Sequence, residues 1–598
     1  MAPSHAVVGP AGARRSPQRI ALWVALALLI LLLAAATWVG VRGLIAKGEL
    51  ESAVPLASAV QRQIVDGDPD AALRTFEELD AHASKAATLT SDPVWRSFEL
   101  LPFAGPNLSA VRELAAVVND VSTDAVGPLV EIAGVIDVDD FKPADGAIDV
   151  QPLIDARPQV AAANTALVDA RTRVDAINTS DTLAPVRGAA NDLKSVVAEA
   201  ADSVDVLDRA IRLLPQALGA AGPRDYVLLF TNPAELRATG GIPGALALLH
   251  TENGRIELAQ QASTSDFPFY DEPVLELPLE TRGLYGDITG QYVQDVNLTP
   301  HFPLSAQLAR EMWRLEFGVE ADGVLSIDPV ALGYLLEATG PITLPTGGVL
   351  TAENAVQTLL VDAYARYENP ADQDAFFAAA AASVFSAVAG GNFDPVALVT
   401  ALAKAGEERR VHVWSADEGE QKMLAGTTLQ GELPTSTATT TRFGAYLNDA
   451  TGAKMDVYLD VDLGVGQATC REDGRPIYRV EVALANTAPS DAAATLSDYV
   501  TGGGNNGVSP GNIKTIVSIY GAPDMQNLGM TRDGAAVGYQ PAVDSTYPVS
   551  LIGVELAPGE STLLQFDWLG AGAFAGKTVI QTTPVVYPAL TRELAFSC

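Results

Sequence analysis

The pattern of apolar and polar positions changes several times along the chain. Residues 20–41 are an apolar run without a charged residue, and residues 46–221 show apolar positions at helical spacing. Between 224 and 435, strand-like apolar runs alternate with helical patterns, and residues 443–598 read as short strands separated by Gly, Asn, Asp and Pro. The sequence therefore predicts a multidomain α+β protein. Its parts are a transmembrane helix, a helical bundle or stalk, a central α/β domain and a C-terminal immunoglobulin-like β-sandwich.

The apolar run at residues 20–41 is long enough to cross a hydrocarbon core of about 30 Å. Trp23 and Trp38 lie near its two ends, where aromatic belts occur, and three arginines precede it. Small residues at 34–36 leave a cleaved signal peptide as the alternative, but the run is longer than a usual signal core. We therefore expect a single-pass signal-anchor, with residues 1–19 cytoplasmic and the remainder extracytoplasmic.

The helical region at 46–221 is rich in alanine. Apolar residues recur at helical spacing from Ala53 to Ile64 and again from Ala163 to Ile177. Such faces could form a coiled-coil surface for a partner, but they are more often the core of a bundle. The pattern favours a bundle that separates the following domains from the membrane.

The region from 224 to 435 predicts several strands and helices. The expected strands are 226–230, 245–250, 255–259, 323–327 and 411–415. The expected helices are 304–317, 330–339, 352–365 and 373–389. Further on, 457–462, 477–485, 513–520 and 561–568 are expected strands of the sandwich, and the glycine-rich run at 501–507 is expected to be a hairpin loop.

Charge and cysteine content narrow the functional classes. The formal net charge of −35 leaves no basic surface for phosphates, so we expect no nucleic-acid partner. The chain has two cysteines, Cys470 and Cys598, which favour one disulfide if the compartment is oxidising. A two-thiol metal site is the alternative, but the histidines are scattered along the sequence. The scarcity of lysine beside abundant Ala, Val, Asp and Gly is typical of bacterial chains from GC-rich genomes.

A polar segment follows the first strand of the α/β region and is the main candidate for a binding site. It carries Asn232, Glu235 and Arg237, followed by Gly240 and Gly241. An arginine can bind an anion through two parallel hydrogen bonds, and paired glycines let backbone N–H groups approach a ligand. The structural alternative is that Arg237 pairs with an acidic neighbour and the glycines only permit a turn.

A second group of polar residues could bind a metal ion. Asp266 and Asp295 could supply oxygen ligands to Mg²⁺, which often takes one or two carboxylates together with substrate phosphate. Asn297 lies two residues further on, before a predicted helix. The alternative is that these side chains form turns and helix caps.

Several separated motifs carry a family resemblance. They are NPAELRATGG, VQDVNLTPHFPLSAQLAREMW, DGVLSIDPVALGYLLEATGPITLP, LTAEN and YLNDATGAKMDVYL. Together they resemble the bacterial DUF4012 family, whose members are membrane-anchored and have no assigned function. The resemblance covers roughly residue 226 to the C-terminus.

The same region has a more distant likeness to the LytR-CpsA-Psr phosphotransferases, which transfer glycopolymers from a polyprenyl-pyrophosphate carrier to peptidoglycan. This likeness implies phosphate binding by Arg237, Mg²⁺ binding by Asp266 and Asp295, and an orienting role for Asn297. Two features depart from that family: ATGGI replaces its Arg-Ser-Asp-Thr run, and no arginine precedes Asp266. Loss of a second arginine removes the usual clamp on a diphosphate.

These observations predict an extracytoplasmic cell-envelope protein. We expect it to bind or transfer an anionic lipid-linked glycopolymer or a related component. The alternative is a non-catalytic scaffold or adhesion protein that binds protein or polysaccharide partners of the envelope.

Overall fold

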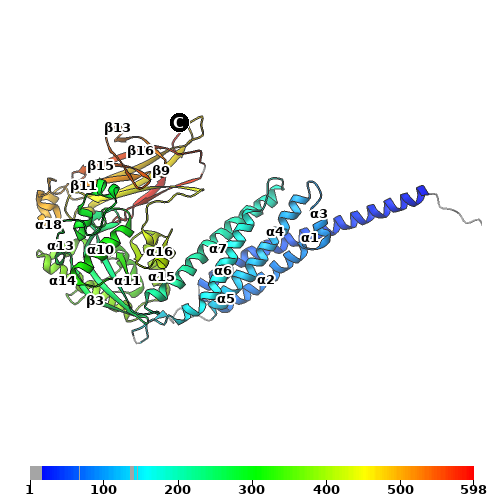
Figure 1. Cartoon of the computed structure of the whole chain (residues 1–598), viewed down its shortest axis with the longest axis horizontal. Coiled ribbons are helices and arrows are strands. Elements are labelled where there is room, and N and C mark those ends of the chain that lie inside the picture. Colours follow the sequence, from blue (N-terminus) through cyan, green and yellow to red (C-terminus); the bar gives the residue numbers. More distant parts are fainter. Residues whose placement is uncertain (1–16, 66, 135–140, 145, 575, 598) are drawn as a thin grey trace, which may run out of the picture. The chain divides into compact units, whose positions relative to one another are not determined.

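The computed structural model describes residues 17–65, 67–134, 141–144, 146–574 and 576–597 (Figure 1). The chain divides into two compact units, one comprising Met1–Asp137 with Pro152–Arg212 and the other Val138–Gln151 with Leu213–Cys598. The fold is mixed α+β, with one apolar helix near the N-terminus and several sheets, as the sequence predicts. Cys598 and residues 1–16 of the expected cytoplasmic tail lie outside the described residues, so the Cys470–Cys598 disulfide stays a prediction.

The first unit is helical and includes both long and short helices. Its elements are α1 (Pro17–Val65), α2 (Pro69–Thr90), α3 (Pro93–Phe98), α4 (Gly105–Val121), η1 (Ser122–Val126), α5 (Gly127–Ala133), α6 (Gln151–Asp175) and most of α7 (Ala184–Ala217). Asp68 and Asp92 accept hydrogen bonds from the first turns of α2 and α3, so each helix begins at a capped residue. The predicted helical faces are buried, including Ala53, Val60 and Ala163.

Helix α1 contains the apolar segment. A helical span at Ala21–Ile64 includes a stretch apolar and long enough to cross a membrane, and hardly any of that stretch is buried by protein. Beyond it, Ala46, Ala53 and Val60 are buried against the bundle. One helix of this kind is consistent with the expected single membrane anchor.

The second unit begins with a five-stranded mixed sheet of order β3-β2-β1-β4-β7. Its strands are β1 (Arg224–Arg237), β2 (Gly240–Glu252), β3 (Arg255–Ser263), β4 (Gly323–Ile327) and β7 (Val411–Ser415); a separate hairpin comprises β5 (Ile342–Thr343) and β6 (Val349–Leu350). Its helices are η3 (Thr264–Asp266), α8 (Leu279–Tyr285), α9 (Ile288–Gln291), η4 (Val293–Asp295), α10 (Phe302–Phe317), α11 (Pro329–Thr339), α12 (Ala355–Gln357), η5 (Thr358–Asp362), α13 (Ala363–Arg366), α14 (Pro370–Ala389), α15 (Pro395–Glu407), α16 (Glu418–Leu424) and η6 (Thr428–Gln430). Only β1 and β4 pair in parallel, and the other neighbours are antiparallel. Helix α10 packs on this sheet through Phe302, Met312 and Trp313.

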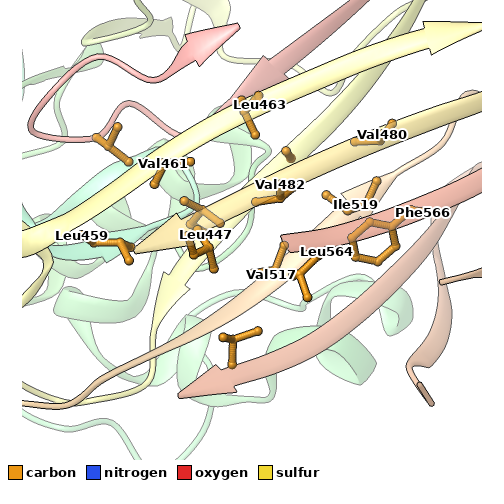
Figure 2. Close-up of a cluster of buried hydrophobic side chains, with 14 of the residues drawn as sticks. Leu447, Leu459, Val461, Leu463, Val480, Val482, Val517, Ile519, Leu564 and Phe566 are labelled. Carbon is orange, nitrogen blue, oxygen red and sulfur yellow. The ribbon is translucent and has the colours of Figure 1, made fainter. Parts of the chain in front are cut away.

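The rest of the second unit forms two sheets, of order β13-β12-β16-β10-β9-β18 and β14-β15-β11-β8-β17. Their strands are β8 (Thr440–Asp449), β9 (Leu459–Ala468), β10 (Ile477–Asn486), β11 (Ile513–Tyr520), β12 (Gln526–Arg532), β13 (Ala535–Ala536), β14 (Gln540–Asp544), β15 (Tyr547–Leu556), β16 (Ser561–Leu569), β17 (Lys577–Thr582) and β18 (Leu590–Glu593). Short helical turns connect them: η7 (Asp456–Tyr458), α17 (Ala492–Thr495), α18 (Asp498–Thr501) and η8 (Gly502–Gly504). Alternate residues of both sheets meet in one apolar core, where Leu447 and Val517 of one sheet lie near Val482 and Phe566 of the other (Figure 2).

The end of β1 joins the mixed sheet to the two-sheet part of the same unit. The side chain of Leu236 belongs to the core between the two sheets, although its strand belongs to the mixed sheet. The backbone N–H of Leu236 donates to Asp456 at 2.8 Å, and that of Ala238 donates to Asn448 at 3.0 Å. The polar residues after Phe230 are therefore tied into the interior of the unit.

His412 on β7 makes the stability of this unit sensitive to acid. Its ring is buried and stacks on Phe302 with centroids 4.9 Å apart; burial, aided by Arg409, lowers its pKa from 6.5 to about 3. Because the unfolded chain binds the proton more readily, the stability contributed by neutral His412 is complete above pH 6.5 and is lost as pH falls. We expect the wild type to lose about 2 kcal/mol more than His412→Gln between pH 6.5 and 5. Urea unfolding of both proteins at both pH values measures the free energy of unfolding. An equal loss of this free energy in the wild type and in His412→Gln would contradict the prediction.

Candidate functional site

The polar segment expected to be a loop is part of a strand. β1 continues to Arg237, with register shifts after Phe230 and after Asn232, and Arg237 pairs with Gly240 across the hairpin. The expected turn is therefore confined to the two residues between β1 and β2. The prediction was wrong here because the polar side chains of β1 find buried partners from distant segments, which sequence periodicity does not reveal.

Gly241 and Gly240 shape this hairpin. A Cβ atom at Gly241 would lie 2.1 Å from the backbone carbonyl of Asn232, so a larger residue is excluded by the neighbouring strand. Gly240 has a φ of 132°, which side chains rarely allow. Both glycines are explained by close strand contact and backbone conformation, which is the structural alternative considered from the sequence.

Arg237 is held by an acidic partner. Its Nη2 and Nε atoms donate to Oδ1 of Asp295 at 2.8 and 3.1 Å, and its Nη1 atom donates to the carbonyl of Leu236. Both charged side chains are largely buried. The structure thus brings two of the predicted site residues together as an ion pair.

Asn297 and Asp266 have structural contacts of their own. Asn297 donates through Nδ2 to the carbonyl of Gly241 at 2.6 Å, and its buried Oδ1 has no hydrogen-bond partner among the described residues. Asp266 accepts from the backbone N–H of Ser263 and closes a capping box around the turn after β3. In the described part of the chain, no group of three or more His, Cys, Asp or Glu side chains is placed to hold a metal ion. The two carboxylates expected to bind Mg²⁺ have protein partners, because Asp266 accepts from Ser263 and Asp295 pairs with Arg237.

Glu235 and Asn232 face a second set of partners. Glu235 forms an ion pair with Lys454, and Asn232 donates through Nδ2 to the hydroxyl of Tyr364 at 2.7 Å. The ammonium of Lys454 lies 4.9 Å from the ring centre of Tyr364 and 4.8 Å from that of Tyr499. Burial lowers the pKa of Lys454, but Glu235, Tyr364 and Tyr499 together raise it above its ordinary value.

Two further carboxylates, the buried Asp456 and the partly buried Asp449, lie near Glu235 and Arg237. Asp449 accepts from the N–H groups of Thr451 and Gly452, and Asp456 accepts from that of Leu236. Burial raises the pKa of both, and the charge of Asp449 raises that of Asp456 further. The carboxylates fix the segment that carries Lys454, because each accepts backbone hydrogen bonds from it or from β1.

A cavity of about 800 Å³ lies beside these residues, within the size range of small-molecule sites. Most of its exposed wall is apolar, with side chains supplied by the mixed sheet and by α11, η5 and α14. The apolar lining residues include Phe230, Ile242, Leu246, Ile327, Leu332, Leu359, Leu360, Phe377 and Ala381. Two of them, Leu359 and Leu360, belong to a π-helical turn, a feature often found at functional sites.

The polar part of the wall is rich in amide, carboxyl and hydroxyl groups. Its members include Asn232, Glu235, Gln261, Ser263, Gln294, Tyr364, Gln373, Asp374, Lys454, Asp498, Tyr499, Asn505 and Asn506. Lys454 is the one Lys or Arg among the lining residues that the structure describes. Of the predicted site residues, Asn232 and Glu235 line the cavity, whereas Arg237, Asp266, Asp295 and Asn297 are not among its lining residues.

Sequence reasoning missed the residues opposite β1. The glycine-rich run at 501–507 is not a hairpin loop, because it lies between β10 and β11, which belong to different sheets. Its Gly502, Asn505 and Asn506 line the cavity together with Tyr499. The available signal was the accumulation of glycine and asparagine beside an exposed tyrosine, a composition that suits a binding loop.

The family comparison matches the part of the chain that contains the hairpin. Residues 221–364 match the DUF4012 family, described as a protein of unknown function. The match runs from the start of β1 to Tyr364 and so includes the first polar residues of the cavity wall. It supports the resemblance stated from the sequence motifs.

The other comparisons add no functional information. A search of curated proteins found no match. A solved structure of a two-domain M1 zinc metallopeptidase bound to L-tryptophan is 15% identical, with a TM-score of 0.11. The match covers 19% of this chain and 20% of that one, and a likeness this low carries no argument about the fold. The likeness to LytR-CpsA-Psr proteins stays a hypothesis.

Proposed function

We propose that this protein is a membrane-anchored, extracytoplasmic cell-envelope protein that binds an anionic lipid-linked glycopolymer or a related component. In this proposal α1 is the single-pass anchor, with its N-terminus cytoplasmic, and the helical unit is the stalk. The second unit, including a two-sheet part of immunoglobulin-like size, holds the ligand. The cavity of about 800 Å³ is the observation that carries the proposal.

The cavity wall suits a molecule with an apolar chain and a polar head. Leu332, Leu359 and Phe377 offer apolar contact to part of a lipid chain. Amide and carboxyl groups such as Asn506 and Asp498 can exchange hydrogen bonds with sugar hydroxyls. The charged Lys454 would meet the anionic linkage between the two parts.

Binding is better supported than transfer. Arg237 is engaged by Asp295 and is not among the lining residues, so Lys454 has no second cation beside it to clamp a diphosphate. Transfer by a Mg²⁺-dependent mechanism like that of the LytR-CpsA-Psr proteins remains the second form of the proposal. A non-catalytic scaffold is the rival function, favoured by the structural contacts of Arg237, Asp266 and Asn297.

Binding of defined probes tests the proposal. A synthetic polyprenyl-phosphate-linked disaccharide should bind the full-length protein more tightly than free disaccharide or free polyprenyl phosphate. Tyr499→Ala should weaken this binding about two- to fivefold, because the ring lies 4.8 Å from the Lys454 ammonium and a cation–π contact of this kind contributes about 0.5–1 kcal/mol. Tyr587→Ala, at an exposed tyrosine that is not among the cavity-lining residues, is the control and should bind normally.

Calorimetry with the protein in detergent measures these affinities. Absence of binding by all three probes would favour the scaffold function. Equal binding of polyprenyl phosphate with and without its sugar would show that the polar wall does not recognise a saccharide.

A further inference from the structure

Two turns of the helical unit lie at the end where the apolar segment of α1 enters the bundle. They are residues 99–104, between α3 and α4, and residues 176–183, between α6 and α7. Arg42, just after this segment, donates to the carbonyls of Thr88 and Leu89 at 2.7 Å and pairs with Asp92 at 3.2 Å. The last turn of α2 and the start of α3 are therefore level with the end of the apolar segment (Figure 1).

The turn after α3 is held close to the end of the apolar segment of α1. The ring of Trp95 lies against α1, 3.5 Å from the position of a Cβ at Gly43, and its Nε1 atom donates to Leu108. The turn between α6 and α7 is close by, because the N–H of Leu183 donates to the Asn107 side chain near the start of α4.

Both turns expose large apolar side chains. Leu100 and Phe103 are 86% and 89% exposed, and Leu183 is 66% exposed. Phe103 has a φ of 69°, a conformation that non-glycine residues adopt only infrequently. Clustered exposed apolar residues of this kind mark a contact surface for protein or membrane.

Two acidic side chains near these turns are paired with arginines, whereas Asp181, two residues before Leu183, is exposed. Glu99 pairs with Arg112 at 2.6 Å, and Asp92 pairs with Arg42. Trp38, at the same end of the apolar segment, lies beneath the Arg42 guanidinium, with 5.1 Å between that group and the ring centre. An aromatic residue paired with a cation is typical of a membrane–water interface.

We infer that the turn at residues 100–103, together with Leu183, inserts into the interface of the bilayer that α1 spans. The occupant of this surface is lipid, because the surface is continuous with the end of the membrane segment. Insertion would give the bundle a second membrane contact and restrict its tilt. The inference rests on the anchoring part of the proposed function and is independent of the ligand.

Tryptophan quenching in vesicles tests the inference with the full-length protein. Phosphatidylcholine brominated near the headgroup end of its acyl chains quenches indoles at the interface. The test variant is Phe103→Trp. The control is Val206→Trp, at a residue that is 63% exposed on α7 and lies about 33 Å from the start of that helix.

We expect the added tryptophan of Phe103→Trp to lose at least about twice the fraction of fluorescence lost by that of Val206→Trp, with a blue-shifted emission. The fluorescence of the unsubstituted protein is subtracted from that of each variant. This fluorescence also reports anchoring, because Trp23 and Trp38 lie in or near the apolar segment. Equal loss at both added positions, with the native tryptophans quenched, would overturn this inference alone. Unquenched native tryptophans would overturn the anchor and this inference together.

Discussion

Replacement of Arg410 by methionine is expected to lower the free energy of unfolding of the second unit by about 3–5 kcal/mol. The Arg410 and Asp328 side chains are 2% and 1% exposed and are joined by a 2.8 Å ion pair. Arg410 also donates to Glu408 and to the carbonyl of Val585, so it connects the mixed sheet with the two-sheet part. Burial raises the pKa of Asp328 despite this partner, and loss of the guanidinium would leave a buried carboxylate without compensation.

A matched variant separates this effect from simple loss of an ion pair. Arg471 pairs with Asp473 at 2.8 Å, but both side chains are more than 40% exposed. Arg471→Met should therefore leave the free energy of unfolding nearly unchanged. Urea unfolding followed by tryptophan fluorescence compares the two variants, and similar losses would show that the Arg410 pair does not join the two parts of the unit.

Filling the cavity is expected to weaken ligand binding strongly. Ala381 on α14 lines the apolar part of the wall, and Ala381→Trp would place an indole in the volume assigned to the lipid chain. The affinity for the lipid-linked disaccharide should fall at least about tenfold. The free energy of unfolding should change by no more than about 3 kcal/mol. Ala371→Trp, on an exposed position of the same helix that is not among the lining residues, should leave binding unchanged.

Unfolding measurements make the cavity test interpretable. If Ala381→Trp is folded and binds normally, the ligand does not occupy this part of the cavity. If Ala381→Trp is unfolded, the smaller change Ala381→Leu serves the same purpose.

The sequence was sufficient to predict the elements that have strong apolar patterns. The strand at 323–327 was predicted with both observed ends. The helix predicted at 304–317 ends at Phe317 as expected, where a glycine follows, but it begins two residues earlier, at Phe302. Most residues of the periodic faces in the helical unit are buried, and the others are partly buried. These features depend on residues that are close together in the sequence, within the same helix or strand or the next one.

The site was only partly predictable, because its contacts join distant segments. Glu235 and Lys454 are 219 residues apart, and Asn232 and Tyr364 are 132 residues apart. Single-sequence periodicity carries no information on such pairs. Arg237 was emphasised because its chemistry suits anions, and the structure pairs it with Asp295. The sequence did indicate the hairpin beside which the cavity lies.

Native mass spectrometry of the full-length protein, extracted in mild detergent, tests the central claim most directly. The account predicts a bound lipid-linked glycan in the wild type and in Ala371→Trp, and its absence from folded Ala381→Trp. Wild-type protein without such an adduct, or an adduct retained equally by Ala381→Trp, would contradict the assignment of the cavity as the ligand site.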